Sequence, residues 1–154
     1  MKLTYRAIPT ETARAYQRGC VDAYGNPPQH FVSDGDGNPC RHCLRMIADR
    51  EDALLVAHRP FTTVQAFAET GPIFLHAREC AQGGGAEAPE ILASPDYIVR
   101  GYSADERIIY GTGGGISPDP LGSRGEELFE QREIAVVDIR SARNNCYQCR
   151  IERG

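Results

Sequence analysis

The sequence predicts an α+β fold, with a mainly antiparallel sheet of about six to seven strands and two helices. Short apolar or alternating segments of strand length recur from Ala53 to the end of the chain, separated by turn residues. The 16 glycines and 10 prolines favour many tight turns over a helical bundle. No strand–helix–strand rhythm is present, which argues against a parallel α/β sheet. A length of 154 residues fits a single domain over residues 1–154.

The first third of the chain predicts one strand and one helix. Residues 5–8 have the pattern of a short strand, and the following helix is expected to take Thr10 as its N-cap. Residues 25–28, which contain a glycine and two prolines, end that helix. Its buried face is expected to consist of Ala13, Tyr16, Cys20, Ala23 and Tyr24. Residues 33–39 are rich in Asp, Gly and Asn and predict a polar turn.

The remainder of the chain is dominated by strand patterns. The expected strands are residues 53–58, 73–76, 97–103, 107–110, 134–141 and 146–153, and the last two should form a hairpin. Glycine-rich segments at 83–85 and 111–122 are predicted to be loops. A second helix is expected to begin at Ser123, because Ser123 and Glu126 have the spacing of a capping box.

Charge and hydropathy exclude several classes of partner. The net charge is −4 and no block of basic residues occurs, so we expect no binding to nucleic acid. No segment approaches the ~20 apolar residues of a membrane span, so we expect no membrane association. The first residues lack the apolar run of a signal peptide, which predicts a cytoplasmic protein with reduced thiols.

Five short motifs resemble a known family when taken together. They are NPCRHCL at 38–44, ETGPIFLH at 69–76, VRGY at 99–102, VDIRSAR at 137–143 and CYQCRIER at 146–153. In these motifs the chain resembles the bacterial family catalogued as domain of unknown function 1203, over essentially its whole length. Relatives often carry histidine where this chain has Asp138. The resemblance implies a small bacterial single-domain protein and carries no established activity.

Two Cys-x-x-Cys pairs are the first candidate site. Cys40, Cys43, Cys146 and Cys149 would supply the four thiolates of a structural zinc ion. Two observations weigh against this set. Tight zinc knuckles usually have a glycine soon after the second cysteine, where this chain has Leu44. In the last predicted strand, moreover, Cys149 should face the core while Cys146 points to the opposite face.

Two other interpretations of the thiols remain open. In the first, His76 and Cys80 join Cys40 and Cys43 in a mixed metal site; otherwise, Cys80 is a small core residue. In the second, Cys40 and Cys43 are a thiol–disulfide pair whose thiolate is favoured by the Arg and His between them. The strand–helix context of thioredoxin-like motifs is missing from the chain, which weakens the redox interpretation.

Charged residues inside predicted strands form the second candidate site. Asp138 disfavours a strand, and a buried charge needs a partner, so an Asp–Arg structural pair is one interpretation. The other is a polar pocket for a small anionic molecule, because arginine binds carboxylates and phosphates through its planar fork. The candidate ligand-binding residues are Arg41, His76, Arg100, Asp138 and Arg140, with His58 beside them.

These observations leave two functional hypotheses. The first is a small-molecule enzyme or binder that uses the polar pocket beside the Cys40–Leu44 segment. The second is a non-catalytic interaction domain stabilised by zinc through the Cys-x-x-Cys thiols. No serine-nucleophile or phosphate-binding motif is present to name a reaction.

Overall fold

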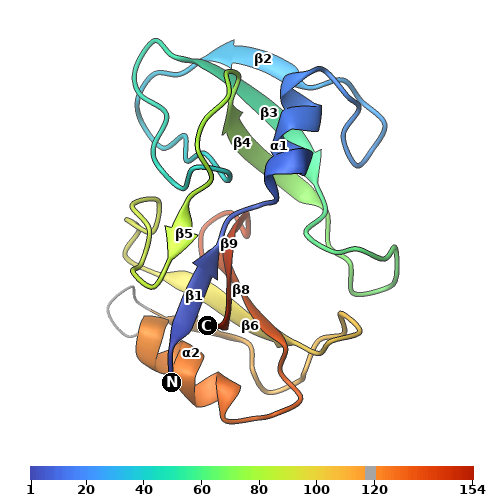
Figure 1. Ribbon diagram of the computed structural model, residues 1–154, viewed down its shortest axis with the longest axis vertical. Helices are drawn as coiled ribbons and strands as arrows, with labels where there is room; N and C mark the ends of the chain where they lie inside the picture. The colour runs from blue at the N-terminus through green and yellow to red at the C-terminus, as the bar shows by residue number, and fades with distance from the viewer. Residues whose placement is uncertain (117–120) are drawn as a thin grey trace.

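The computed structural model describes residues 1–116 and 121–154, and these residues form two helices and nine strands in two sheets (Figure 1). The strands are β1 (Leu3–Arg6), β2 (Gln29–Val32), β3 (Asp52–His58), β4 (Gly71–His76), β5 (Gly84–Gly85), β6 (Tyr97–Tyr102), β7 (Gly114–Ile116), β8 (Val136–Ser141) and β9 (Tyr147–Arg153). The helices are α1 (Thr10–Gln17) and α2 (Leu121–Phe129). Every described strand pair is antiparallel, which confirms the predicted α+β class.

The larger sheet has the order β5-β1-β9-β8-β6-β7 and carries α2 on one face (Figure 1). Its centre is the predicted closing hairpin of β8 and β9, in which Ile139 lies opposite Cys149. Leu128 and Phe129 of α2 belong to the same core as Val137. The alternating apolar residues of the central strands therefore form one side of a core that the helix covers.

The smaller sheet has the order β2-β3-β4 and packs with α1 around a second core. Ala13 and Tyr16 of the helix are buried with Leu54 and Leu75 of the sheet. Strand β1 leads directly into α1, so residues 6–9 connect the larger sheet to the smaller one (Figure 1). The junction between the two sheets therefore contains this connection, the end of β3 and strand β9.

Helix α1 is shorter than predicted. It ends at Gln17 instead of near Gly25, and the side chain of Tyr24 is 66% exposed although it was expected to be buried. Its N-cap position is taken by Pro9, and Thr10 is the first helical residue. The Thr10 hydroxyl does not cap the helix; it lies 2.9 Å from Nε2 of His42.

Four other local predictions are wrong in whole or in part. Helix α2 begins at Leu121, so Ser123 lies inside the helix and does not start a capping box. Residues 107–110 form only a single bridge to β6, whose edge partner is instead β7. Gly84 pairs with β1 and does not form a free loop tip. The two backbones lie so close that a Cβ at Gly84 would clash with the carbonyl oxygen of Tyr5. The predicted loop at 111–122 is wrong in part, because residues 114–116 form β7 and residues 121–122 belong to α2. Residues 117–120 of this segment lie outside the described residues.

Neither helix in the described part of the chain has the length and apolar character needed to cross a bilayer.

Candidate metal centre

The loop Cys40–Cys43 is fixed on both sides by backbone hydrogen bonds. The N–H of Leu44 donates to the carbonyl of Cys40 at 3.0 Å, and the N–H of Cys40 donates to the carbonyl of Arg45 at 2.9 Å. These bonds close a tight turn, after which Leu44 has a left-handed φ of 58°. The two cysteines of this loop are therefore held on the same turn.

This loop lies along β4, which supplies the histidine of the cluster. Cys40 forms a parallel bridge with Phe74, and the N–H of Arg41 donates to the Phe74 carbonyl at 3.1 Å. The bridge places Cys40 beside the end of the strand, where the N–H of His76 lies 3.4 Å from the Cys40 sulfur. This contact brings together Cys40 and His76, which are 36 positions apart in the chain.

Helix α1 holds the segment between His76 and Cys80. The amide Nε2 of Gln17 donates to the carbonyls of His76 and Arg78 at 3.0 and 2.9 Å. Arg14 donates from Nη2 to the carbonyl of Cys80 at 2.8 Å. The chain between β4 and β5 is thus fixed by side chains of the helix, and Cys80 is turned toward the loop.

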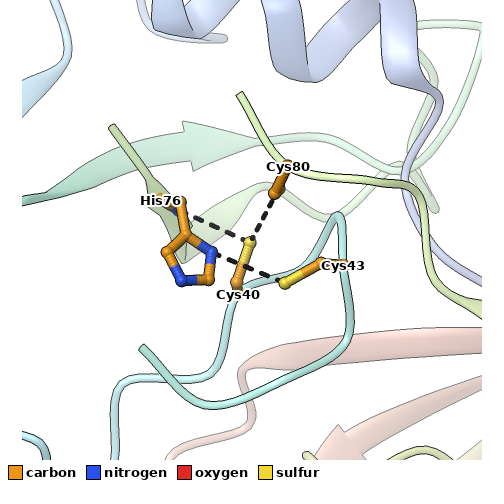
Figure 2. Close-up of side chains that lie close together, drawn as sticks. All are labelled: Cys40, Cys43, His76 and Cys80. Carbon is orange, nitrogen blue, oxygen red and sulfur yellow. Dashed lines mark hydrogen bonds between the residues drawn. The ribbon is translucent and has the colours of Figure 1, made fainter. Parts of the chain in front are cut away.

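Four ligand atoms converge in this place: the sulfurs of Cys40, Cys43 and Cys80 and a ring nitrogen of His76 all lie within 4.8 Å of one another (Figure 2). The Cys40 and Cys80 sulfurs are 3.9 Å apart, and the Cys43 sulfur is 3.5 Å from Nδ1 of His76. Cys40 is fully buried, and the other three are partly exposed. We call these four residues the cysteine–histidine cluster, and it could hold a metal ion.

Two separations within the cluster agree with a tetrahedral ion. Zinc bonds of about 2.3 Å to sulfur and about 2.0 Å to nitrogen give tetrahedral edges of about 3.8 Å between sulfurs and about 3.5 Å between sulfur and nitrogen. The two edges above, 3.9 and 3.5 Å, match these lengths. Soft thiolates with one imidazole are a ligand set that favours zinc among the common divalent ions.

A second layer of polar groups orients the ligands. Nε2 of His76 lies 3.0 Å from a carboxylate oxygen of Glu51, which leaves Nδ1 to face the sulfurs. A carboxylate on the distal nitrogen is the usual partner of a metal-binding histidine. His42, which is fully buried, places Nδ1 3.2 Å from the sulfur of Cys80. Burial lowers the pKa of His42, which favours its neutral ring. A neutral ring that donates Nδ1–H to a Cys80 thiolate accepts at Nε2 from the Thr10 hydroxyl.

The three thiols cannot all ionise by themselves. Hydrogen bonds from Cys43 and then Cys80 lower the pKa of Cys40 well below its usual value. The same contact with Cys40 raises the pKa of Cys43 and raises that of Cys80 strongly. One thiolate, on Cys40, is therefore favoured, and its contact with Cys43 and Cys80 opposes the ionisation of these two thiols. A divalent cation reverses this opposition, because thiols that coordinate a metal ion are deprotonated.

The structure does not bring the second Cys-x-x-Cys pair to this cluster. Cys149 is fully buried in the core of the larger sheet, where burial raises the pKa of its thiol. Cys146 lies in the β8–β9 turn, with its sulfur 3.6 Å from the carbonyl of Asn144. Within the described residues, the four thiols proposed from the sequence are thus split, and His76 and Cys80 accompany Cys40 and Cys43. The signal for the mixed set was the His76–Cys80 spacing.

The arginines and the aspartate proposed as ligand-binding residues are engaged with other protein groups. Arg41 is buried and donates to the carbonyls of Tyr147 and Pro39, both at 2.6 Å. Asp138 is fully buried and accepts from Arg150 at 2.6 and 3.2 Å. The structural Asp–Arg pair considered from the sequence is therefore present. Burial nevertheless raises the pKa of Asp138, while Arg150 opposes that shift.

Glu69 occupies the remaining two arginines of the candidate pocket. One of its oxygens lies 2.9 Å from Nη1 of Arg100, and the other lies 2.8 Å from Nη2 of Arg140. Sequence patterns did not indicate Glu69, because its partners Arg100 and Arg140 lie on strands distant in the chain. Arg150 could have been found, because it lies opposite Asp138 in the predicted β8–β9 hairpin. Glu51 was missed for the same reason as Glu69, whereas His42 was considered only in the redox interpretation, as a neighbour of the two thiols.

Comparison with known proteins identifies one family model, described as "Protein of unknown function (DUF1203)", which matches residues 37–153. No curated protein and no solved structure matches the chain. The matched residues include the whole cysteine–histidine cluster.

Proposed function

The chain belongs to the family of proteins of unknown function DUF1203, and we propose from its own residues that it is a zinc-stabilised protein with a structural, non-catalytic ion. The ligands are the three sulfurs of the cysteine–histidine cluster and Nδ1 of His76. The observation that supports this proposal most directly is the match between the two measured separations and the edges of a zinc tetrahedron.

The ligand count supports a structural role for the ion. Catalytic zinc sites usually keep one coordination position for water or substrate, with three protein ligands. Here four protein ligands fill the tetrahedron, and Cys40 among them is fully buried. The outer contacts from Glu51 and His42 fix two ligands further. We therefore assign the ion no step in a reaction.

The position of the cluster explains what the ion stabilises. It joins the Cys40–Cys43 loop to the end of β4 and to the segment that leads to β5. Gly83 donates its N–H to the carbonyl of His42 at 2.8 Å, and a Cβ at Gly83 would clash with the Cys43 carbonyl oxygen. These segments contain little regular structure, so a metal ion replaces the backbone pairing that they lack.

Metal content tests this proposal. Protein purified without a histidine tag should contain about one zinc ion per chain, as measured by mass spectrometry of the metal. Cobalt substituted for zinc should give the absorption spectrum of tetrahedral thiolate coordination. Cys43→Ser should lose the zinc and bind cobalt weakly.

Cys146→Ser is the matched control, because Cys146 belongs to the four-thiol set that the structure does not assemble. It should keep the zinc content and cobalt spectrum of the unmodified protein. If Cys146→Ser loses zinc as Cys43→Ser does, the ligand set is wrong. If the unmodified protein binds no zinc and cobalt gives no tetrahedral spectrum, the proposal is wrong altogether.

A further inference from the structure

A cavity of about 260 Å³ lies at the junction of the two sheets, apart from the cysteine–histidine cluster. Its walls come from the β1–α1 connection, the end of β3 with the residues after it, and β9. The volume is at the small end of ligand sites in proteins. It is large enough for a small metabolite and too small for a nucleotide cofactor.

Three guanidinium groups line this cavity, from Arg6, Arg59 and Arg150. Glu152 is the one carboxylate in the lining, and it pairs with Arg6 at 3.0 Å. Arg150 uses Nε and Nη2 for Asp138 and for the carbonyl of Pro60, which leaves Nη1 without a hydrogen bond among the described residues. The cavity therefore has an excess of positive charge and unused donors.

Arg59 adds a hydrogen-bond donor whose lack of an acceptor costs free energy. Its Nε is buried and has no hydrogen-bond partner in the described part of the chain. A buried donor without an acceptor loses the hydrogen bonds that water would give it. An oxyanion in the cavity would supply the missing acceptor, and arginine is suited to it because its fork matches carboxylate and phosphate oxygens.

The start of α1 adds to the positive potential of the cavity, and the ring of His58 completes its polar lining. Pro9 and Thr12, at the start of α1, line it, and the N-terminus of this helix has no side-chain cap. His58 also lines it; burial lowers the pKa of His58 to about 4, and Arg150, Arg59 and Arg41 contribute to that shift. The ring of His58, whose Nδ1 lies 3.1 Å from the Tyr16 hydroxyl, is therefore neutral at pH 7.

The remaining walls are apolar or aromatic. Phe61 and Tyr147 line the cavity and are each 6% exposed, and the guanidinium carbon of Arg150 lies 5.6 Å from the centre of the Phe61 ring. Such a site combines a charged end with a ring-lined wall, which suits a ligand with an anionic group on a small apolar body.

We propose that this cavity binds a small organic anion, with Arg59 and Arg150 bound to its carboxylate or phosphate and Phe61 and Tyr147 in contact with its apolar part. This site keeps the ligand class predicted from the sequence but uses different residues. Arg41, Arg100, Asp138 and Arg140 do not line the cavity. The proposal is independent of the zinc ion, whose ligands lie outside it.

NMR titration of the full chain in its purified, metal-loaded form tests the proposal. The probes are benzoate and phenyl phosphate, with phenol as the uncharged probe of the same ring. At least one anion should shift the ring resonances of His58 in a saturable way. The anion that binds more tightly shows whether the site prefers a carboxylate or a phosphate. Phenol should bind much more weakly than the anion, and added salt should weaken the binding of the anion.

Arg59→Gln should weaken binding of that anion roughly tenfold or more, because a charged hydrogen bond is lost. Arg124→Gln is the matched control: Arg124 pairs with Glu127 on α2, away from the cavity, and its loss should change nothing. The proposal fails if neither anion shifts His58, if phenol binds as tightly, or if the two variants bind alike. If Arg59→Gln does not fold, the unmodified protein still tests the proposal. Phenol that binds as tightly as the anion, or anion binding that salt does not weaken, would overturn it.

Discussion

Leu44 shows how a single residue can replace the glycine of a metal-binding turn. It follows the second cysteine of the loop and has a φ of 58°, a conformation that costs a non-glycine residue about 1–2 kcal/mol. Its side chain is 1% exposed in the core of the larger sheet, and burial of a leucine contributes about 1.5–3 kcal/mol. Packing therefore offsets the backbone strain, which is why the absence of glycine did not exclude a turn here.

This balance predicts an unusual order of variants. Leu44→Ala should lower the free energy of unfolding by about 2–5 kcal/mol, because it leaves a cavity and keeps the strain. Leu44→Gly removes the strain as well, so it should be at least as stable as Leu44→Ala. Urea unfolding of the metal-loaded proteins measures both. At Leu54, which is equally buried in β3, glycine should instead be less stable than alanine by about 1 kcal/mol. If glycine is less stable than alanine at position 44 as well as at position 54, the backbone of Leu44 is not strained.

His58 predicts a pH dependence of stability. Its pKa is about 4 in the folded protein because of burial, and about 6.5 in an unfolded chain. Between these values the unfolded chain binds a proton that the folded protein does not, so stability falls as the pH falls from about 6.5 to about 4. Below that range both states are protonated and this loss ends. The total amounts to at most about 3 kcal/mol.

His58→Gln should lose less stability than the unmodified protein between pH 7 and pH 4.5, measured by urea unfolding at each pH. The pH dependence of the metal site is common to both proteins and cancels in the comparison. Equal losses in the two proteins would mean that His58 takes up no proton on unfolding in this range.

At the scale of elements, the strands that could be predicted are those whose own residues are apolar. β3, β4, β6, β8 and β9 all carry runs or alternations of this kind, and all are present. β5 and β7 consist mainly of glycine and gain their strand conformation from a neighbour, as Gly84 does from Arg6 of β1. The end of α1 was misplaced because Cys20, Ala23 and Tyr24 keep the helical spacing, although Cys20 and Tyr24 are exposed and only Ala23 is half-buried.

The candidate metal site was predictable to a similar degree. Cys40 and Cys43 are close in sequence, so their spacing alone indicated a shared turn. Which residues complete the set depends on the bridge between Cys40 and Phe74, a contact between distant segments that no local pattern encodes. The strand alternation around Cys149 correctly placed that thiol in the core.

At the scale of the whole molecule, the loop Cys40–Leu44 connects two separate cores. Cys40 packs in the core of the smaller sheet, and Leu44 packs in the core of the larger one. Arg41, between them, donates to the carbonyl of Tyr147 in β9. The cysteine–histidine cluster itself lies on the side of the smaller sheet, whose three strands and short helix α1 form the smaller of the two cores.

Removal of the metal should therefore affect the two halves unequally. An ion present at 1,000 times its dissociation constant stabilises the folded state by about 4 kcal/mol, and this contribution disappears with a chelator. Amides of β3 and β4 should lose hydrogen-exchange protection first, while those of β8 and β9 should keep theirs. None of the four ligands belongs to the larger core, which Leu44 alone connects to the metal-binding loop. Hydrogen exchange before and after chelation measures this difference, and Cys43→Ser should reproduce the chelated pattern. Equal loss of protection in both sheets would mean that they unfold as one cooperative unit, whereas no loss in either would show that the ion does not stabilise the fold.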